Sequence, residues 1–138
     1  MKQYVYEVLE EAAKKRHKAQ KVKVLQDNES WALKDILRGS MDSTVQWNLP
    51  GGNPPYTPAE PSTHPTNLIR ENKQFAYFVK GGKGDKLPAF KRENIFIGLI
   101  EGVHPKDAEL IIAMINKEKP AGLSRPIVEE AFPGLLRD

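Results

Sequence analysis

The chain has 138 residues, of which 39% are hydrophobic and 28% are charged, and these values are typical of one globular domain with its own core. Cysteine is absent, which excludes disulfides, thiolate nucleophiles and thiolate metal sites, and we predict neither a metal nor a cofactor. The longest apolar run, Ile95 to Ile100, is far shorter than the roughly 20 residues of a membrane span, and no signal-peptide pattern opens the sequence. We therefore expect a cytoplasmic protein.

The net charge of +3 is unevenly distributed along the chain. Basic residues outnumber acidic ones in 1–27 and 69–94, whereas acidic residues are in excess in 28–68 and 95–138. A basic balance favours anionic partners such as nucleic acid. Lysines that only solubilise two helix faces explain the same distribution, and we favour that interpretation.

Two helices are predicted in the N-terminal part. Apolar residues from Val5 to Ala12 are spaced for one helical stripe within 3–18. The apolar residues in 22–25 continue this segment, either as further helix or as a short bend. The second predicted helix holds Trp31 and the apolar residues up to 37, with Asn28 or Ser30 as its cap and Gly39 as its stop.

The middle of the chain has a different character. Alternating apolar residues in 45–49 indicate a brief extended segment. The stretch 50–65 holds six of the eleven prolines and cannot be helix or central strand, because proline lacks the backbone donor. We expect a proline-rich loop or arm there, either wrapped over the domain or flexible. Trp47 and Tyr56 are predicted to bind a partner, since aromatic side chains are common at interfaces.

Helical structure is predicted to resume at Thr66 or Asn67 and to end at the Gly81-Gly82 pair. The next segment, GGKGDKLP, is rich in glycine and lysine and invites comparison with a phosphate-binding loop. That pattern requires a preceding strand and a closing Gly-Lys-Ser/Thr. Here a helical pattern precedes the segment, and Gly84 and Asp85 follow the lysine. A solvated turn is the interpretation that fits.

A helical hairpin is predicted between Pro88 and Pro120, with its corner at the four residues GVHP, 102–105. His104 and the acidic residues Asp107 and Glu109 raise the possibility of a general base or a metal site. The positive end of the helix dipole explains acidic residues in a first turn, and the motif contains no serine or cysteine nucleophile. The sequence therefore favours a structural, capping role for His104.

The segment AGLSRPIVEEAF, 121–132, resembles the second half of a helix-turn-helix. Pro120 interrupts the helix that would have to precede the turn of such a motif. A helix capped by Ser124, whose apolar residues enter the core, explains the same sequence.

Several phrases resemble a known family. NESWALKDILRGSMD, WNLPGGNPPYTP, FVKGG, KRENIFIGLIEGVHPKDAELI and VEEAFPGLL, in this order over 21–138, are similar to small proteins of tailed bacteriophages related to T4, including cyanophages. The resemblance implies a phage origin. Since that family has no assigned activity, it carries no catalytic residues over to this chain.

We therefore predict a mainly α protein in which residues 1–138 form a single domain of about six helices with a helical hairpin and a long proline-rich surface segment. No set of nucleophile, base and orienting group can be assembled, so an enzyme is disfavoured. The predicted function is that of a non-enzymatic phage-encoded protein that binds a host or phage macromolecule, a protein rather than nucleic acid, in the host cytoplasm without contacting a membrane.

Two alternatives stay open, a virion structural component and a nucleic-acid-binding accessory factor. In the second case the phosphate contacts would come from basic residues in two segments of the chain, namely Lys14, Lys15, Arg16, Lys18, Lys80, Lys83, Lys86, Lys91 and Arg92.

Overall fold

The computed structural model describes residues 4–138, and within that range the chain is mainly helical and forms no strand. Its α-helices are α1 (Val5–Lys14), α2 (Lys18–Asp27), α3 (Trp31–Met41), α4 (Leu68–Glu71), α5 (Ala89–Gly102), α6 (Pro105–Ile115) and α7 (Arg125–Ala131). Three 3₁₀ helices, η1 (Pro61–Thr63), η2 (Asn72–Tyr77) and η3 (Lys83–Lys86), lie between α3 and α5. The predicted mainly helical fold is confirmed, and none of these helices is long and apolar enough to cross a membrane.

The described range holds seven α-helices rather than about six, because the N-terminal helical segment is interrupted. Lys15 and His17 have extended backbone angles, with ψ of 146° and 143°, so that α1 ends and α2 begins as a separate helix. The helix predicted from Asn67 is shorter than expected. α4 has four residues, and the chain then continues as the 3₁₀ helix η2.

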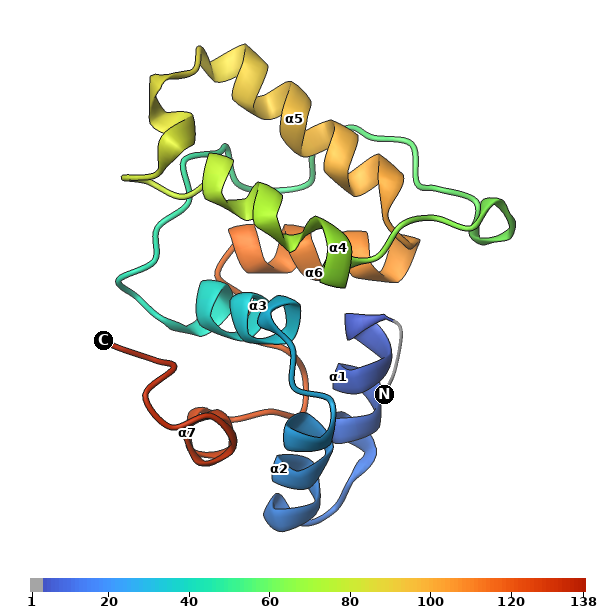
Figure 1. The fold of residues 1–138 in the computed structure, drawn as a ribbon, viewed down its shortest axis with the longest axis vertical. Coiled ribbons are helices and arrows are strands. Elements are labelled where there is room, and N and C mark those ends of the chain that lie inside the picture. Colours follow the sequence, from blue (N-terminus) through green and yellow to red (C-terminus); the bar gives the residue numbers. More distant parts are fainter. Residues whose placement is uncertain (1–3) are drawn as a thin grey trace.

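The helices are arranged in three groups along the longest axis of the molecule (Figure 1). At one end α2 packs against both α1 and α7. In the middle α3 and α6 pack on each other, and α1 also contacts α6. At the other end α5 packs on α6, close to the 3₁₀ helices η2 and η3. α6 is therefore the element that connects the two ends.

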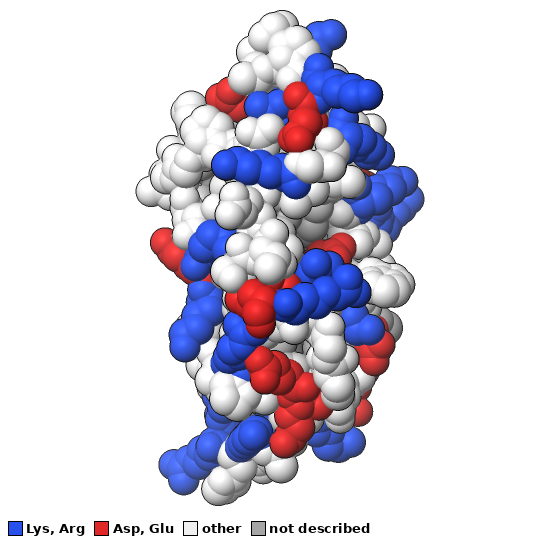
Figure 2. Space-filling model, turned by 90° about the vertical axis from the view of Figure 1, so that its left-hand side faces the viewer, with Lys and Arg blue, Asp and Glu red and all other residues white. Residues whose placement is uncertain are grey.

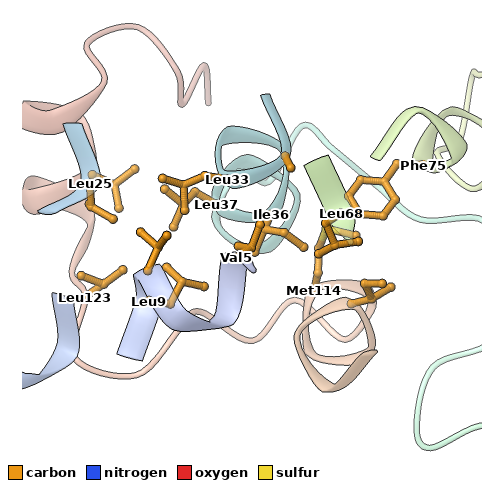
Figure 3. Close-up of a cluster of buried hydrophobic side chains, with 14 of the residues drawn as sticks. Val5, Leu9, Leu25, Leu33, Ile36, Leu37, Leu68, Phe75, Met114 and Leu123 are labelled. Carbon is orange, nitrogen blue, oxygen red and sulfur yellow. The ribbon is translucent and has the colours of Figure 1, made fainter. Parts of the chain in front are cut away.

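A continuous apolar core runs through these groups (Figure 3). The stripe predicted for the first helix does face it, since Val5, Val8, Leu9 and Ala12 are all buried. Buried side chains of the helices α2 to α7 and of η2 complete the cluster, and Leu123 reaches it from the segment before α7.

Gly39 has a different role from the one that its position after an apolar helix predicted. α3 continues through it to Met41, so Gly39 is not the stop of this helix. A β-carbon at this position would lie 2.6 Å from both Met114 Sδ and Trp47 Cζ2. The absence of a side chain therefore allows α6 and the Trp47 ring to approach α3 closely.

Three of the predicted caps formed, whereas Ser124, at the N-cap position of α7, makes no side-chain capping hydrogen bond within the described residues. The Ser30 hydroxyl accepts a hydrogen bond from the Leu33 amide at 3.1 Å, and the Asn67 side chain accepts one from the Arg70 amide at 3.1 Å. At the corner between α5 and α6, His104 is the N-cap residue, and its Nδ1 accepts a hydrogen bond from the Lys106 amide at 3.1 Å. His104 thus has the capping geometry expected of it.

The stretch 50–65 contains no regular structure except η1 and lies mostly exposed beside α5 and α6. Gly52 and the Asn116 side chain exchange two hydrogen bonds, of 2.7 and 3.1 Å. Further along, the Thr57 amide donates to Glu101 Oε2 at 2.8 Å, and the Thr66 amide donates to the Gly102 carbonyl at 3.0 Å. Between 57 and 66 the chain extends away from the helices as a loop (Figure 1).

The contact at Gly39 generates a stability prediction. Gly39→Ala should lower the free energy of unfolding by about 1–3 kcal/mol, because the new methyl group overpacks the space shared by Met114 and Trp47. Gly98→Ala in α5 is the matched control, since its β-carbon would meet no atom within 4 Å from other parts of residues 4–138. It should stabilise by up to about 1 kcal/mol through helix propensity. Urea denaturation of the two variants measures the difference, and equal stabilities would contradict the close packing.

Candidate functional site

A groove opens between α3, η2 and the segment that leads into the proline-rich stretch. Its volume is about 340 Å³, which lies within the range of sites that hold a small ligand or a few side chains of a partner. Its lining comes from segments far apart in the sequence, namely Asp35, Arg38, Gly39, Val45, Trp47, Asn72, Lys73, Phe75, Ala76 and Val79.

Trp47 forms an apolar wall of this groove and is fixed from several sides. Its indole Nε1 donates to the Gly39 carbonyl at 3.0 Å, and its ring meets Phe75 edge-on with centroids 6.3 Å apart. The backbone beside it pairs with the end of η2, where the Asn48 amide donates to the Phe78 carbonyl and the Lys80 amide to the Gln46 carbonyl. The groove is therefore formed in the free protein.

Lys117 fixes the other end of the same segment. Its ammonium donates to the carbonyls of Gly39, Asp42 and Val45 at 2.7, 2.8 and 2.9 Å, and so satisfies carbonyls at the C-terminal end of α3. Partial burial lowers the pKa of this ammonium, against the opposing effect of the nearby Asp42 and Asp138 carboxylates. Its hydrogen bonds hold residues 42–47 in the conformation that brings Trp47 to the groove.

The groove carries charges of both signs above its apolar floor. Asp35 and Arg38 come from α3, and Lys73 comes from η2. Burial raises the pKa of the Asp35 carboxyl, although a 2.8 Å hydrogen bond from the Asn72 side chain and the charge of Arg38 oppose that shift. The polar groups of the lining are carboxylate, guanidinium, ammonium and amide groups, which form hydrogen bonds and ion pairs.

Tyr56, the other predicted partner-binding residue, lies elsewhere. It lines a separate groove of about 280 Å³ beside α6, together with Asn53, Glu109 and Asn116. Burial and the nearby Glu109 carboxylate raise the pKa of its hydroxyl. The structure therefore brings Trp47 and Tyr56 into two grooves rather than one site.

The predicted basic residues also separate into two groups. Lys14, Lys15, Arg16 and Lys18 lie at the turn between α1 and α2, whereas residues 80–92 lie at the opposite end of the long axis (Figure 1). The positions of these residues along the sequence do not indicate that the two groups lie at opposite ends of the molecule. The two groups cannot form one continuous phosphate-binding surface.

Arg92 differs from the lysines around it because it is buried. Its guanidinium donates to the carbonyls of Asn48, Gly84 and Leu87 at 2.7, 3.1 and 3.0 Å. Only 9% of the residue is exposed. The geometry gives Arg92 the structural task of holding the 84–87 segment against the start of α5.

Asp107, at the corner that the sequence singled out, is buried completely. Its Oδ1 accepts a hydrogen bond of 2.9 Å from the Tyr6 amide, so this one carboxylate lies at the N-terminal ends of both α1 and α6. Its Oδ2 has no hydrogen-bond partner within residues 4–138. Burial raises the pKa of this carboxyl to about 6, with a hydrogen bond from Tyr6 opposing the shift and Glu7 adding to it.

Sequence reasoning missed two exposed aromatic residues. Trp31 is 74% exposed and Phe90 is 63% exposed. A signal existed for Trp31, because it precedes Leu33 by two positions and therefore lies off the stripe that Leu33, Ile36 and Leu37 form. Phe90, at the start of α5, carried no such signal.

These observations define a small, mainly helical protein with a preformed groove and two separate groups of basic residues. A family model matches residues 8–120, and the chain belongs to that family, which is described as a family of unknown function (DUF6433). Comparison with the curated proteins gave no match.

The buried carboxyl of Asp107 generates a pH prediction. Because its pKa is raised above the usual 3.8, the folded protein binds the proton more tightly than the unfolded chain does. The free energy of unfolding should therefore rise as the pH falls through about 6 towards 4, by on the order of 2–3 kcal/mol from this group.

Asp107→Asn should remove the contribution of this group to the rise, because an amide does not titrate, while its oxygen can still accept the Tyr6 hydrogen bond. The exposed Glu109→Gln on the same helix is the control and should leave the pH profile unchanged. Denaturation midpoints across the pH range measure both. An Asp107→Asn profile that still follows the wild type would show that another group titrates.

Proposed function

We propose that this chain is a non-enzymatic, phage-encoded binding protein that acts on a host or phage protein in the host cytoplasm, through the groove beside Trp47. The observation that carries the proposal is the preformed groove of about 340 Å³, whose apolar wall is fixed by the Trp47–Gly39 hydrogen bond. A preformed apolar surface costs little ordering on association, which favours binding.

The chemistry of the groove favours a polypeptide occupant. Trp47, Phe75 and Val79 offer aromatic and aliphatic surface to an apolar side chain. Asp35 offers hydrogen-bond acceptors, and Arg38 and Lys73 offer donors. This combination suits a peptide backbone or polar side chains of both kinds. A carboxylate inside the groove disfavours a phosphate backbone at this place.

The phage origin and the host compartment rest on other support. The similarity of five phrases over 21–138 to small proteins of T4-related phages supports the origin. Membership of a family of unknown function attaches no activity to the chain, and the cysteine-free composition suits a reducing cytoplasm.

The test uses a substitution that fills the groove without touching the core. Ala76 is exposed at the groove, and Ala76→Arg should place a long charged side chain across it. Ala19→Arg, at an exposed position of α2, adds the same group far from the groove.

Each variant is used to capture partners from nuclease-treated lysates of phage-infected cells, and the affinity for the captured protein is then measured with purified components. We expect the wild type and Ala19→Arg to bind equally and Ala76→Arg to bind at least about tenfold more weakly. Equal binding by Ala76→Arg would contradict the proposal, and so would a partner that is captured from untreated lysates and lost from nuclease-treated ones.

A further inference from the structure

Four lysines and an exposed phenyl ring gather at the end of the molecule formed by η2, η3 and the start of α5, which we call the lysine end. Lys80, Lys83, Lys86 and Lys91 are all exposed there, and Phe90, which precedes Lys91 at the start of α5, is 63% exposed. Figure 2 shows Lys and Arg side chains predominating over the upper part of this face, whereas both signs mix over the lower part.

The backbone that carries these lysines is held rigidly. A β-carbon on Gly84 would lie 1.8 Å from the Tyr77 carbonyl oxygen, so this segment packs directly on η2 and only glycine fits. The Arg92 guanidinium binds the Gly84 and Leu87 carbonyls from within. The lysines therefore project from a preorganised surface, which reduces the entropy lost on binding.

The acidic residue inside this segment is bound to the protein itself. Asp85 accepts a hydrogen bond from the Gly81 amide at 2.7 Å with one carboxylate oxygen, and from the Asn48 side chain at 3.0 Å with the other. These hydrogen bonds fix the carboxylate in the turn, and four lysine ammonium groups against this one carboxylate leave the segment with an excess of positive charge.

We propose that the lysine end binds single-stranded nucleic acid, with the lysines contacting phosphates and Phe90 stacking on a base. Positive charge alone would attract any polyanion, but an exposed aromatic ring among lysines matches the combination by which proteins bind unpaired strands. A base in a duplex has no free face to offer, so the ring favours a single strand. Tyr77 is less available, since Lys83 Nζ lies 4.3 Å from its ring centroid. This inference is independent of the groove beside Trp47.

The test measures fluorescence anisotropy of labelled oligo-dT and oligo-U of about 12 nucleotides across a salt series. We expect the logarithm of the association constant to fall linearly with the logarithm of the salt concentration. Replacing Lys83, Lys86 and Lys91 together by glutamine should reduce that slope by about two units, because each lost phosphate contact removes about 0.7. Phe90→Ala should weaken binding about tenfold and leave the slope unchanged.

The matched control replaces Lys14, Lys15 and Lys18 by glutamine at the opposite end, and it should keep the wild-type affinity within about twofold. Circular dichroism confirms that each variant is folded. An equal loss in the control, no effect of Phe90→Ala, or duplex DNA binding as tight as the single strand would overturn the proposal. So would displacement of the oligonucleotide by polyglutamate at equal charge, which would assign this end to acidic proteins. Phe90→Ala lies outside the groove beside Trp47 and should capture the protein partner as the wild type does, so that failure at either site is distinguishable.

Discussion

The structure depends on the close approach of α3 and α6 at Gly39. The missing side chain lets Met114 and Trp47 reach the helix, and the Gly39 carbonyl accepts hydrogen bonds from both Trp47 Nε1 and Lys117 Nζ, at 3.0 and 2.7 Å. One residue thus determines the contact between the central helices, the end of α3 and the wall of the groove. A side chain at this position would disturb all three together, because each depends on the same close approach.

α6 also orders its neighbours through charged groups at its two ends. At its N-terminal end, Asp107 accepts the Tyr6 amide of α1. Just beyond its C-terminal end, Lys117 donates to the carbonyls where α3 finishes. The N-terminus of a helix carries a partial positive charge and the C-terminus a partial negative charge. The Asp107 carboxylate and the Lys117 ammonium therefore interact favourably with the helix dipoles near them. Asp107 still bears the cost of full burial, and its raised pKa is the sign of that cost.

The sequence predicted what depends on neighbours along the chain. The apolar stripe of α1 and the caps at Ser30, Asn67 and His104 follow from spacing and residue type within one turn of helix, and the structure confirms them. The sequence did not predict the features that depend on contacts between segments distant in the chain. The sequence favours Gly39 as a helix stop, because it does not reveal the close approach of Met114 and Trp47, which lie in other segments. The burial of Asp107 and Arg92 and the separation of the basic groups to opposite ends likewise depend on tertiary packing. The chain belongs to a family of unknown function. The phage origin that the resemblance implies stays a proposal.

The central claim is that a partner binds a groove that already exists beside Trp47. The two tryptophans of the chain allow a direct measurement, since Trp31 is 74% exposed whereas the Trp47 indole is hydrogen-bonded within the fold. Solvent exchange and chemical shifts of both indole N–H groups can be followed by NMR in the free protein and after addition of the captured partner. Slow exchange of Trp47 in the free protein, fast exchange of Trp31, and a shift of Trp47 alone on binding are the predicted results. Fast exchange of Trp47, or a shift confined to Trp31, would contradict the account.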